Sequence, residues 1–275
     1  MIDGWTPKAD SINLRFGIEY HTALHDYEKF KATGLDHDKS LTLTVQESLG
    51  RIASWEDMEP RTDSEKLKTR YNLIRTVIWY LDKFKDDQAE TIILSTGEPA
   101  CELTFRFELD WGPIPEQPYV LCGHLDRVVR FQGSVFGMDR KTASKTLGSY
   151  YFDQYQPENQ MTLYTLATQV IYEAPVKGMI IDAAQVAVGF SRFVRGFTYR
   201  TSDQLDEWIK DLEYWLVSAE TFAERGYWPM NDTACDKYGG CRFRNVCNKS
   251  PGVRENFLRS DFVKGERWNP LKSRG

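Results

Sequence analysis

The sequence of 275 residues has no long uninterrupted apolar run, no low-complexity linker and no internal repeat. A membrane-spanning helix needs about 20 apolar residues, and none of the runs reaches that length without charge. The N-terminus, from Met1 to Trp5, also lacks the charged-then-apolar pattern of a secretion signal. We therefore expect a soluble, cytoplasmic protein, and its 41% hydrophobic content is enough to bury a sizeable core.

An excess of positive charge is also missing. Lysine and arginine number 35 against 40 aspartate and glutamate residues, which gives a formal net charge of -5. This balance argues against a protein that coats nucleic acid through an overall cationic surface. It does not exclude an enzyme acting on nucleic acid, because carboxylates that hold metal ions add negative charge and the ions return positive charge to the site.

Cysteine is scarce, and three of the five cysteines lie close together near the C-terminus: Cys235, Cys241 and Cys247. An odd number with this clustering favours a metal or cluster site in a reducing compartment over a disulfide framework. The alternative is three free thiols in a surface loop. We expect one catalytic domain, residues 1-230, with a Cys-rich appendage, residues 231-275, packed on it.

The hydrophobic pattern changes period along the chain. Helical spacing predicts helices over residues 16–34, 41–55, 62–85, 158–172 and 203–225. Alternation of apolar and polar residues predicts strands over residues 91–95, 100–109, 119–131 and 134–142, and further strands within 178–201. This order predicts an α/β or α+β fold with a central mixed β-sheet flanked by helices and a helical N-terminal part.

Two charged clusters fall on neighbouring predicted strands. Gln132-Gly133 forms a tight hairpin turn, since glycine accepts positive φ without steric cost. A hairpin centred there pairs residues whose numbers sum to about 265, which sets Asp126 opposite Asp139. Asp139 and Lys141 are two residues apart, so strand alternation points both side chains to one face.

Two carboxylates and an ammonium group on one face predict a divalent-metal site, because each unpaired buried charge would cost several kcal/mol. Mg²⁺ or Mn²⁺ takes oxygen ligands and keeps water molecules, so such a site suits phosphodiester hydrolysis. Lys141 can orient the attacking water or stabilise developing negative charge. The alternative is a surface salt bridge between the strands, which contributes under about 1 kcal/mol.

Four short motifs resemble the PD-(D/E)XK nuclease superfamily and its RecB-like exonuclease branch, which includes CRISPR-associated and phage-encoded small exonucleases. The motifs lie between residues 16 and 164: a Gly-x-x-x-His helix at Gly17 to His21, Gly123-His124-Leu125-Asp126, Asp139-Arg140-Lys141-Thr142, and a Gln-x-x-x-Tyr helix at Gln160 to Tyr164. The resemblance implies a restriction-endonuclease-like core and metal-dependent cleavage of phosphodiesters.

The resemblance also implies a role for each matched residue. The catalytic set would be Asp126, Asp139 and Lys141. The ligands of Mg²⁺ or Mn²⁺ would be His21, Asp126, Asp139 and the backbone carbonyl of Arg140. DNA would be bound by Gln160 and Tyr164, which share a helix face.

Each of these assignments has a plainer alternative. His21 could be a core or capping histidine, and Gln160 and Tyr164 could be ordinary helix-surface residues. Glu102, on the strand before Asp126, is a candidate ligand of a second metal or a support for the first. Arg127 and Arg140 should turn to the opposite face and form salt bridges.

For the cysteines, the RecB-like branch implies a [4Fe-4S] cluster held by three C-terminal cysteines and one near the N-terminus. This sequence has no cysteine before His21. The fourth ligand would then be of another type, or the site would hold zinc.

We expect a metal-dependent DNA exonuclease, phage-encoded and acting in recombination, repair or defence. Its partner would be single- or double-stranded DNA, with a homo-oligomer or a recombination protein as further partners. Two alternatives stay open. One is a nucleic-acid-binding or assembly subunit that keeps the nuclease fold without turnover, and the other is a hydrolase of small phosphate esters. The sequence also leaves open DNA against RNA, polarity, and exonuclease against endonuclease cleavage.

Overall fold

The computed structural model describes residues 4–8, 11–55, 58–111, 118–172, 175–235, 240–266 and 269. The chain divides into two compact units, one of Ile12–Ile209 and one of Met1–Ser11 with Lys210–Gly275. Helix α7, Ser202–Glu224, runs from the larger unit into the smaller one. All predicted site residues except the three clustered cysteines belong to the larger unit.

The larger unit is built on a six-stranded mixed sheet. Its strands are β2 (Glu90–Thr91), β3 (Cys101–Leu109), β4 (Tyr119–Phe131), β5 (Ser134–Ala143), β6 (Val176–Val186) and β7 (Ser191–Tyr199). Their order is β2-β4-β5-β6-β7, and β3 also pairs with β4. The β5–β6 pair is parallel, while the other pairs described in this sheet are antiparallel. The predicted central mixed sheet is therefore confirmed.

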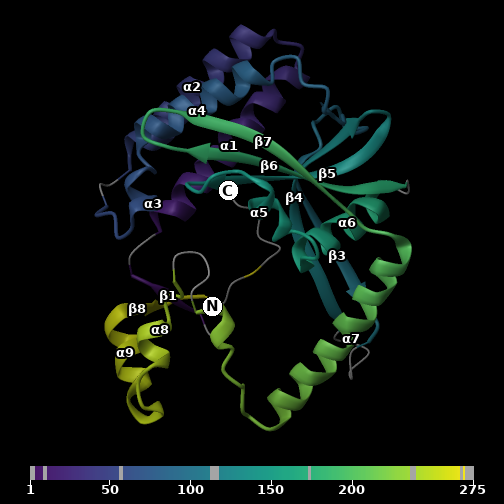
Figure 1. Ribbon diagram of the computed structural model, residues 1–275. Helices are drawn as coiled ribbons and strands as arrows, with labels where there is room; N and C mark the ends of the chain where they lie inside the picture. The colour runs from purple at the N-terminus through teal and green to yellow at the C-terminus, as the bar shows by residue number, and fades with distance from the viewer. Residues whose placement is uncertain are drawn as a thin grey trace. The chain divides into compact units, whose positions relative to one another are not determined.

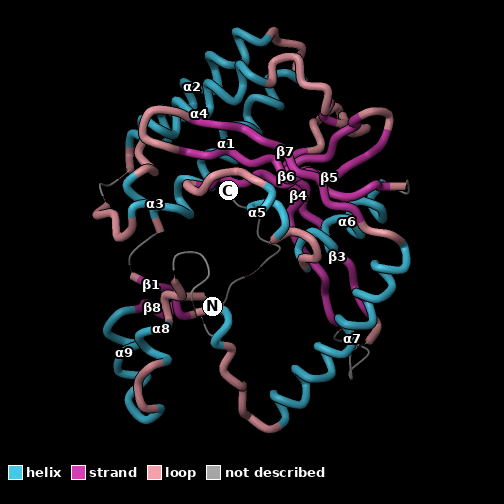
Figure 2. Tube along the Cα trace, viewed as in Figure 1, coloured by secondary structure: helices cyan, strands magenta, loops and turns pink. Residues whose placement is uncertain are grey.

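Helices cover both faces of this sheet. They are α1 (Ile12–Ala32), α2 (His37–Ala53), α3 (Asp63–Lys66), α4 (Arg70–Lys83), α5 (Ser149–Asp153) and α6 (Asn159–Tyr172). Helices α1, α2 and α4 lie over one face and α6 over the other (Figure 1), and the strands between them are easily followed in Figure 2. None of the helices in the described ranges is long and apolar enough to span a bilayer.

The main core lies between the first helical layer and the sheet. Phe16, Tyr20 and Leu24 on α1 are spaced by four residues, so they form one buried stripe. They pack with Leu73 and Val77 of α4. Periodic burial of this kind explains why α1 was predictable from its sequence, and it fixes the helix that carries His21 against the sheet.

The predicted helix over residues 62–85 is interrupted, and the prediction of one continuous helix is wrong. The side chain of Thr62 accepts a hydrogen bond from the Glu65 N–H at 3.2 Å and begins α3 as expected. Thr69 then has an extended backbone and accepts from the Asn72 N–H at 3.1 Å, so it begins α4. A second N-cap threonine inside a helical apolar pattern is the physical reason for the break.

The smaller unit pairs segments from the two ends of the chain. Strand β1 (Trp5–Pro7) is antiparallel to β8 (Phe262–Lys264), with Thr6 opposite Val263. The remaining elements are η1 (Asp232–Ala234), α8 (Arg244–Cys247), η3 (Pro251–Val253) and α9 (Arg254–Asp261). Phe243 stacks on Phe262, with 4.5 Å between ring centroids. The residues predicted as a Cys-rich appendage, 231–275, fall within this unit.

Gly178 is expected to be required for the β6–β7 pair. Its φ is 152°, and a Cβ placed there would lie 2.1 Å from the backbone oxygen of Thr198. Because backbone cannot move aside cheaply, Gly178→Ala should lower the free energy of unfolding by about 1–3 kcal/mol in urea titrations. Gly189→Ala is the control, since a Cβ there would have no described atom within 4 Å other than those of its two chain neighbours. Equal effects of the two substitutions would contradict this view.

Candidate active site

The β4–β5 hairpin brings the two predicted carboxylates together. Arg127 pairs with Met138, so the pairing has the predicted register and its next step sets Asp126 against Asp139. Gln132 and Gly133 form the turn with φ values of 49° and 75°. Two successive positive φ values are what a tight two-residue hairpin requires, and they match the twist of the flanking strands.

Both carboxylates are buried, with Asp126 9% exposed and Asp139 2% exposed. The Arg140 N–H donates a hydrogen bond of 2.7 Å to Oδ2 of Asp126. Oδ2 of Asp139 lies 2.7 Å from Nζ of Lys141. Each buried negative charge therefore has a fixed positive or donor group beside it, as burial of charge demands.

A line of polar groups leads from this centre onto helix α6. Nζ of Lys141 donates to Oε1 of Gln160 at 3.2 Å, and Nε2 of Gln160 donates to the Tyr164 hydroxyl at 3.1 Å. Gln160 and Tyr164 are one helical turn apart, which places them on the same side of α6. The structure thus brings the Gln-x-x-x-Tyr motif next to the lysine of the strand motif.

Helix α1 and the start of β3 add an imidazole and a third carboxylate. Nδ1 of His21 lies 3.3 Å from Oδ1 of Asp126 and 3.9 Å from Oε1 of Glu102. One ligand atom from each of these three residues lies within 4.8 Å of the others. Carboxylate oxygens with one imidazole nitrogen suit Mg²⁺ or Mn²⁺, so this donor set fits a divalent cation.

Glu102 reaches this position through an unusual backbone. Its φ is 52°, in the left-handed region that non-glycine residues seldom adopt. The regular β3–β4 pairing holds at Cys101 and at Leu103 but skips the residue between them. Local strain of this kind is often found where a side chain must be aimed at a functional site.

The protonation states follow from burial and from these neighbours. Burial raises the pKa of Asp139; the Lys141 ammonium opposes this rise, and the Asp126 charge adds to it. Burial would also raise the pKa of Asp126, but His21 and the Arg140 N–H hold it below its usual range. Burial alone would lower the pKa of His21, yet the Asp126 carboxylate raises it overall.

Lys141 stays charged in this environment. Burial alone would lower the pKa of Lys141, but the carboxylates of Asp139 and Asp126 outweigh burial and raise it. An ammonium group that keeps its proton donates hydrogen bonds and cannot accept a proton from water.

A family model of the PD-(D/E)XK nuclease superfamily matches residues 3–248 of this sequence. The chain belongs to this superfamily. The nuclease also resembles a solved structure from Eubacterium rectale that is provisionally named an exonuclease, with 9% sequence identity and a TM-score of 0.48. That similarity covers 91% of this chain and 81% of the other. No curated protein matches it. The predicted superfamily is confirmed, and it makes the protein a nuclease with a nucleic-acid substrate.

Two buried arginines of the nuclease lie on the opposite face, as predicted. Arg127 lies 3.2 Å from Glu28 and 3.3 Å from Asp87, and Arg140 lies 3.9 Å from Glu28. The predicted salt bridges are confirmed. Sequence reasoning missed Glu28, although its position seven residues after His21 places it two helical turns further along the same side of α1.

The three clustered cysteines belong to the smaller unit. The Cys241 N–H donates to the Cys235 carbonyl oxygen at 2.8 Å, and Cys247 is the last residue of α8. All three are half-buried and have free thiols. The residues between the first two, 236–239, lie outside the described residues. Metal or cluster binding by these thiols stays a prediction.

If the site binds a metal ion, its affinity for that ion should weaken as the pH is lowered. Protons compete with the metal for Asp139 and His21, because both have raised pKa values. Titration calorimetry with Mn²⁺ from about pH 8 to about pH 5 should show weakening affinity and release of protons on binding. His21→Ala should weaken binding at least about tenfold and flatten this dependence.

His124→Ala is the matched control for the calorimetry. His124 is a β4 histidine whose Nδ1 contacts Thr104 Oγ1 at 2.9 Å, and it is not one of the three residues whose ligand atoms converge. It should bind Mn²⁺ as the wild type does. Affinity that is constant over the pH range, or equal losses in both histidine variants, would contradict the assigned ligands.

Proposed function

We propose that this nuclease is a divalent-metal-dependent DNA exonuclease of the RecB-like branch. The supporting observation is the convergence of four sequence motifs, spread over residues 17–164, on one centre whose two aspartates are buried. The residues that meet there are His21, Asp126, Asp139, Lys141, Gln160 and Tyr164. Gln160 and Tyr164 favour a polymeric substrate over a small phosphate ester, because they extend the polar surface away from the carboxylates.

The metal would be held by His21, Asp126, Asp139 and the backbone carbonyl of Arg140, with Glu102 as a further ligand or a support for His21. A bound Mg²⁺ or Mn²⁺ supplies Lewis-acid polarisation of the phosphodiester and lowers the pKa of a coordinated water. The Arg140 N–H fixes Asp126 through Oδ2, so that Oδ1 is left facing His21. Buried ligands held in this way lose little freedom when a metal binds.

Lys141 would stabilise the negative charge that develops on the phosphoryl oxygens. It is suited to this because it remains an ammonium group and is held by Asp139 at 2.7 Å. A fixed cation inside a partly desolvated site acts more strongly than one in water. The same position would let Lys141 orient or activate the attacking water, as predicted from the sequence.

Gln160 and Tyr164 would hold the DNA backbone beside the scissile bond. Burial raises the pKa of Tyr164 to about 12, so its hydroxyl remains a donor at neutral pH. Its ring packs edge-on against Phe105, with centroids 6.0 Å apart. A phenol fixed by packing can place one hydrogen bond on a phosphate or sugar oxygen.

The resemblance to the RecB-like branch also favours a phage-encoded role in recombination, repair or defence.

The test of this function is cleavage of 5′-labelled and 3′-labelled DNA, single- and double-stranded, with Mn²⁺, Mg²⁺ or EDTA. Wild-type protein should release nucleotides from an end only with metal, and the label that is lost first gives the polarity. Lys141→Ala should reduce the rate by about 10²–10³-fold, as removal of a charge-stabilising donor does. Lys177→Ala, which removes an exposed lysine of β6, is the control.

Other outcomes of that assay would identify other functions. Cleavage of RNA alone would show that the substrate is RNA rather than DNA. Internal cleavage of circular DNA would show that the protein is an endonuclease rather than an exonuclease. Turnover of bis(p-nitrophenyl) phosphate without any cleavage of nucleic acid would indicate a small phosphate ester. Binding of DNA with no turnover at any metal concentration would favour the assembly-subunit alternative.

We further propose that Cys235, Cys241 and Cys247 hold a [4Fe-4S] cluster, or Zn²⁺, that stabilises the smaller unit. Three free, half-buried thiols occur within 13 residues, and two of them are joined by a backbone hydrogen bond. A fourth ligand would come from a residue other than cysteine, because the sequence has no cysteine before His21.

Elemental analysis after anaerobic purification tests this centre. Iron with acid-labile sulfide, or zinc, should be present in stoichiometric amount, and a Cys235→Ser, Cys241→Ser, Cys247→Ser variant should lose it. Cys122→Ser is the matched control and should keep the metal. Protein that folds normally with neither element would contradict the proposal.

A further inference from the structure

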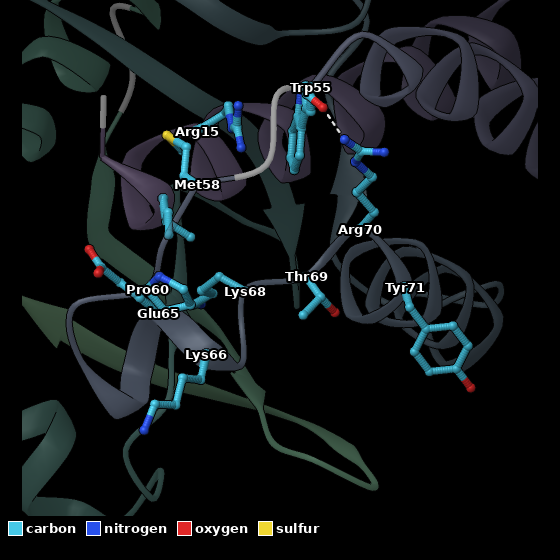
Figure 3. A pocket seen from close by; sticks show the side chains of 11 residues that line it. Arg15, Trp55, Met58, Pro60, Glu65, Lys66, Lys68, Thr69, Arg70 and Tyr71 are labelled. Atoms are coloured by element: carbon cyan, nitrogen blue, oxygen red, sulfur yellow. Dashed lines mark hydrogen bonds between the residues drawn. The ribbon is translucent and has the colours of Figure 1, made fainter. Parts of the chain in front are cut away.

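A pocket of about 320 Å³ lies beside the first turns of α1, between the end of α2 and the start of α4. Its lining includes Arg15, Trp55, Lys66, Lys68, Arg70 and Tyr71 (Figure 3). Among the described lining residues, four are basic and one, Glu65, is acidic. The carboxylate of Glu65 accepts a 2.7 Å hydrogen bond from the Arg61 N–H. The lining as described therefore favours an anionic ligand.

Lys68 is the feature that points to such a ligand. Its side chain lines the pocket although the residue is only 6% exposed, and Nζ has no hydrogen-bond partner within the described part of the chain. Its nearest recorded contact is the Phe16 ring, 4.4 Å from Nζ. Burial lowers the pKa of Lys68 to about 7. A buried amine without an acidic partner costs stability, and an anion in the pocket would remove that cost.

The aromatic part of the lining suits a nucleobase. The Arg15 guanidinium lies 4.6 Å from the Trp55 ring centroid, and Arg70 donates a hydrogen bond to the Trp55 carbonyl oxygen (Figure 3). Tyr71 is 73% exposed at the rim. Flat rings beside cationic side chains are the combination by which proteins hold single strands, with bases stacked on rings and phosphates paired with lysine or arginine.

The pocket is also close to the catalytic centre. Arg15 and His21 lie six residues apart on α1, which is about 9 Å along the helix axis. On the other side, Oγ of Ser64 on α3 is 2.9 Å from Oγ of Ser144, three residues beyond Lys141. Stacked nucleotides rise about 3.4 Å each along a strand. Since about 9 Å is the distance along the helix axis alone, a strand that joins the pocket to the catalytic centre would need about three nucleotides or more.

We propose that this pocket is a nucleotide subsite that binds single-stranded DNA about three or more positions from the bond that is cut, with a phosphate on Lys68 and a base against Trp55 or Tyr71. The inference rests on the proposed function, since it assigns a part of the same substrate. It adds a reason why a protein with a net charge of -5 can hold a polyanion: binding is local, in a small basic and aromatic pocket.

Lys68→Met is the test, because methionine keeps an unbranched apolar chain of nearly the same length and lacks the amine. Anisotropy of a fluorescein-labelled 12-nucleotide single strand in EDTA should show affinity weakened about tenfold. With Mn²⁺, KM for the same strand should rise by a similar factor while kcat is retained. Hydrolysis of bis(p-nitrophenyl) phosphate, which occupies only the catalytic centre, should be unchanged. The Tm should be equal or higher, since an unpaired buried amine is lost.

Two further variants complete the design. Lys39→Met removes an exposed lysine of α2 and controls for the loss of one charge. Tyr71→Ala changes an exposed rim residue, so it is independent of folding, and it should weaken strand binding at least about fivefold through lost stacking.

The outcomes separate the subsite from the nuclease function. Strand binding by Lys68→Met and Tyr71→Ala equal to that of Lys39→Met would overturn the subsite. A parallel fall in bis(p-nitrophenyl) phosphate hydrolysis would also overturn it, because Lys68 would then act on the catalytic centre. If the wild type cleaves no substrate at all, the proposed function fails, while the anisotropy measurements still decide whether the pocket binds DNA.

Discussion

The turn at Gln132 and Gly133 holds two successive residues at positive φ, and the pairing of β4 with β5 is set from that point. Strand side chains alternate between the faces of a sheet, so a slip of one residue would send Asp139 to the opposite face from Asp126. The same slip would break the hydrogen bond that the Arg140 N–H donates to Asp126. Every other contact of the catalytic centre is added to this pair of strands.

Helix α1 contributes side chains that contact residues on both faces of the β4–β5 hairpin. His21 meets Asp126 at the catalytic centre, and Glu28, two turns later, compensates Arg127 and Arg140. Arg140 is 1% exposed, so a neighbouring carboxylate is needed to offset its desolvation. The same helix packs through a continuous apolar stripe, which ties the position of His21 to the main core. Ligand geometry and charge compensation thus depend on one rigid element.

Much of this arrangement is readable in the sequence, because it depends on local patterns. The glycine turn and period-2 alternation predict the hairpin register, and the four motifs predict the superfamily. The parallel pairing of β5 with β6 is not readable in this way, since it depends on a crossover through α6 rather than on a turn. The second helix start at Thr69 was missed because the apolar pattern continues through it.

Two features of the site lie beyond sequence patterns altogether. The left-handed backbone of Glu102 arises from strand packing, and nothing in its neighbours marks it. The burial of Lys68 likewise depends on how α3 and α4 close over Phe16. From the sequence, Lys68 would be read as a surface charge, because lysine is usually exposed. Tertiary contacts, which a single sequence does not display, decide otherwise.

The β1–β8 pair affects the order in which the two units can fold during synthesis. Thr6 pairs with Val263, which is synthesised 257 residues later, so the β1–β8 pair cannot form before then. At ribosomal rates of about 5–20 residues per second, that delay is on the order of ten seconds or more. The catalytic unit is synthesised well within this interval and can fold first. The smaller unit, which needs both β1 and β8, can assemble only after the residues of the catalytic centre have been made.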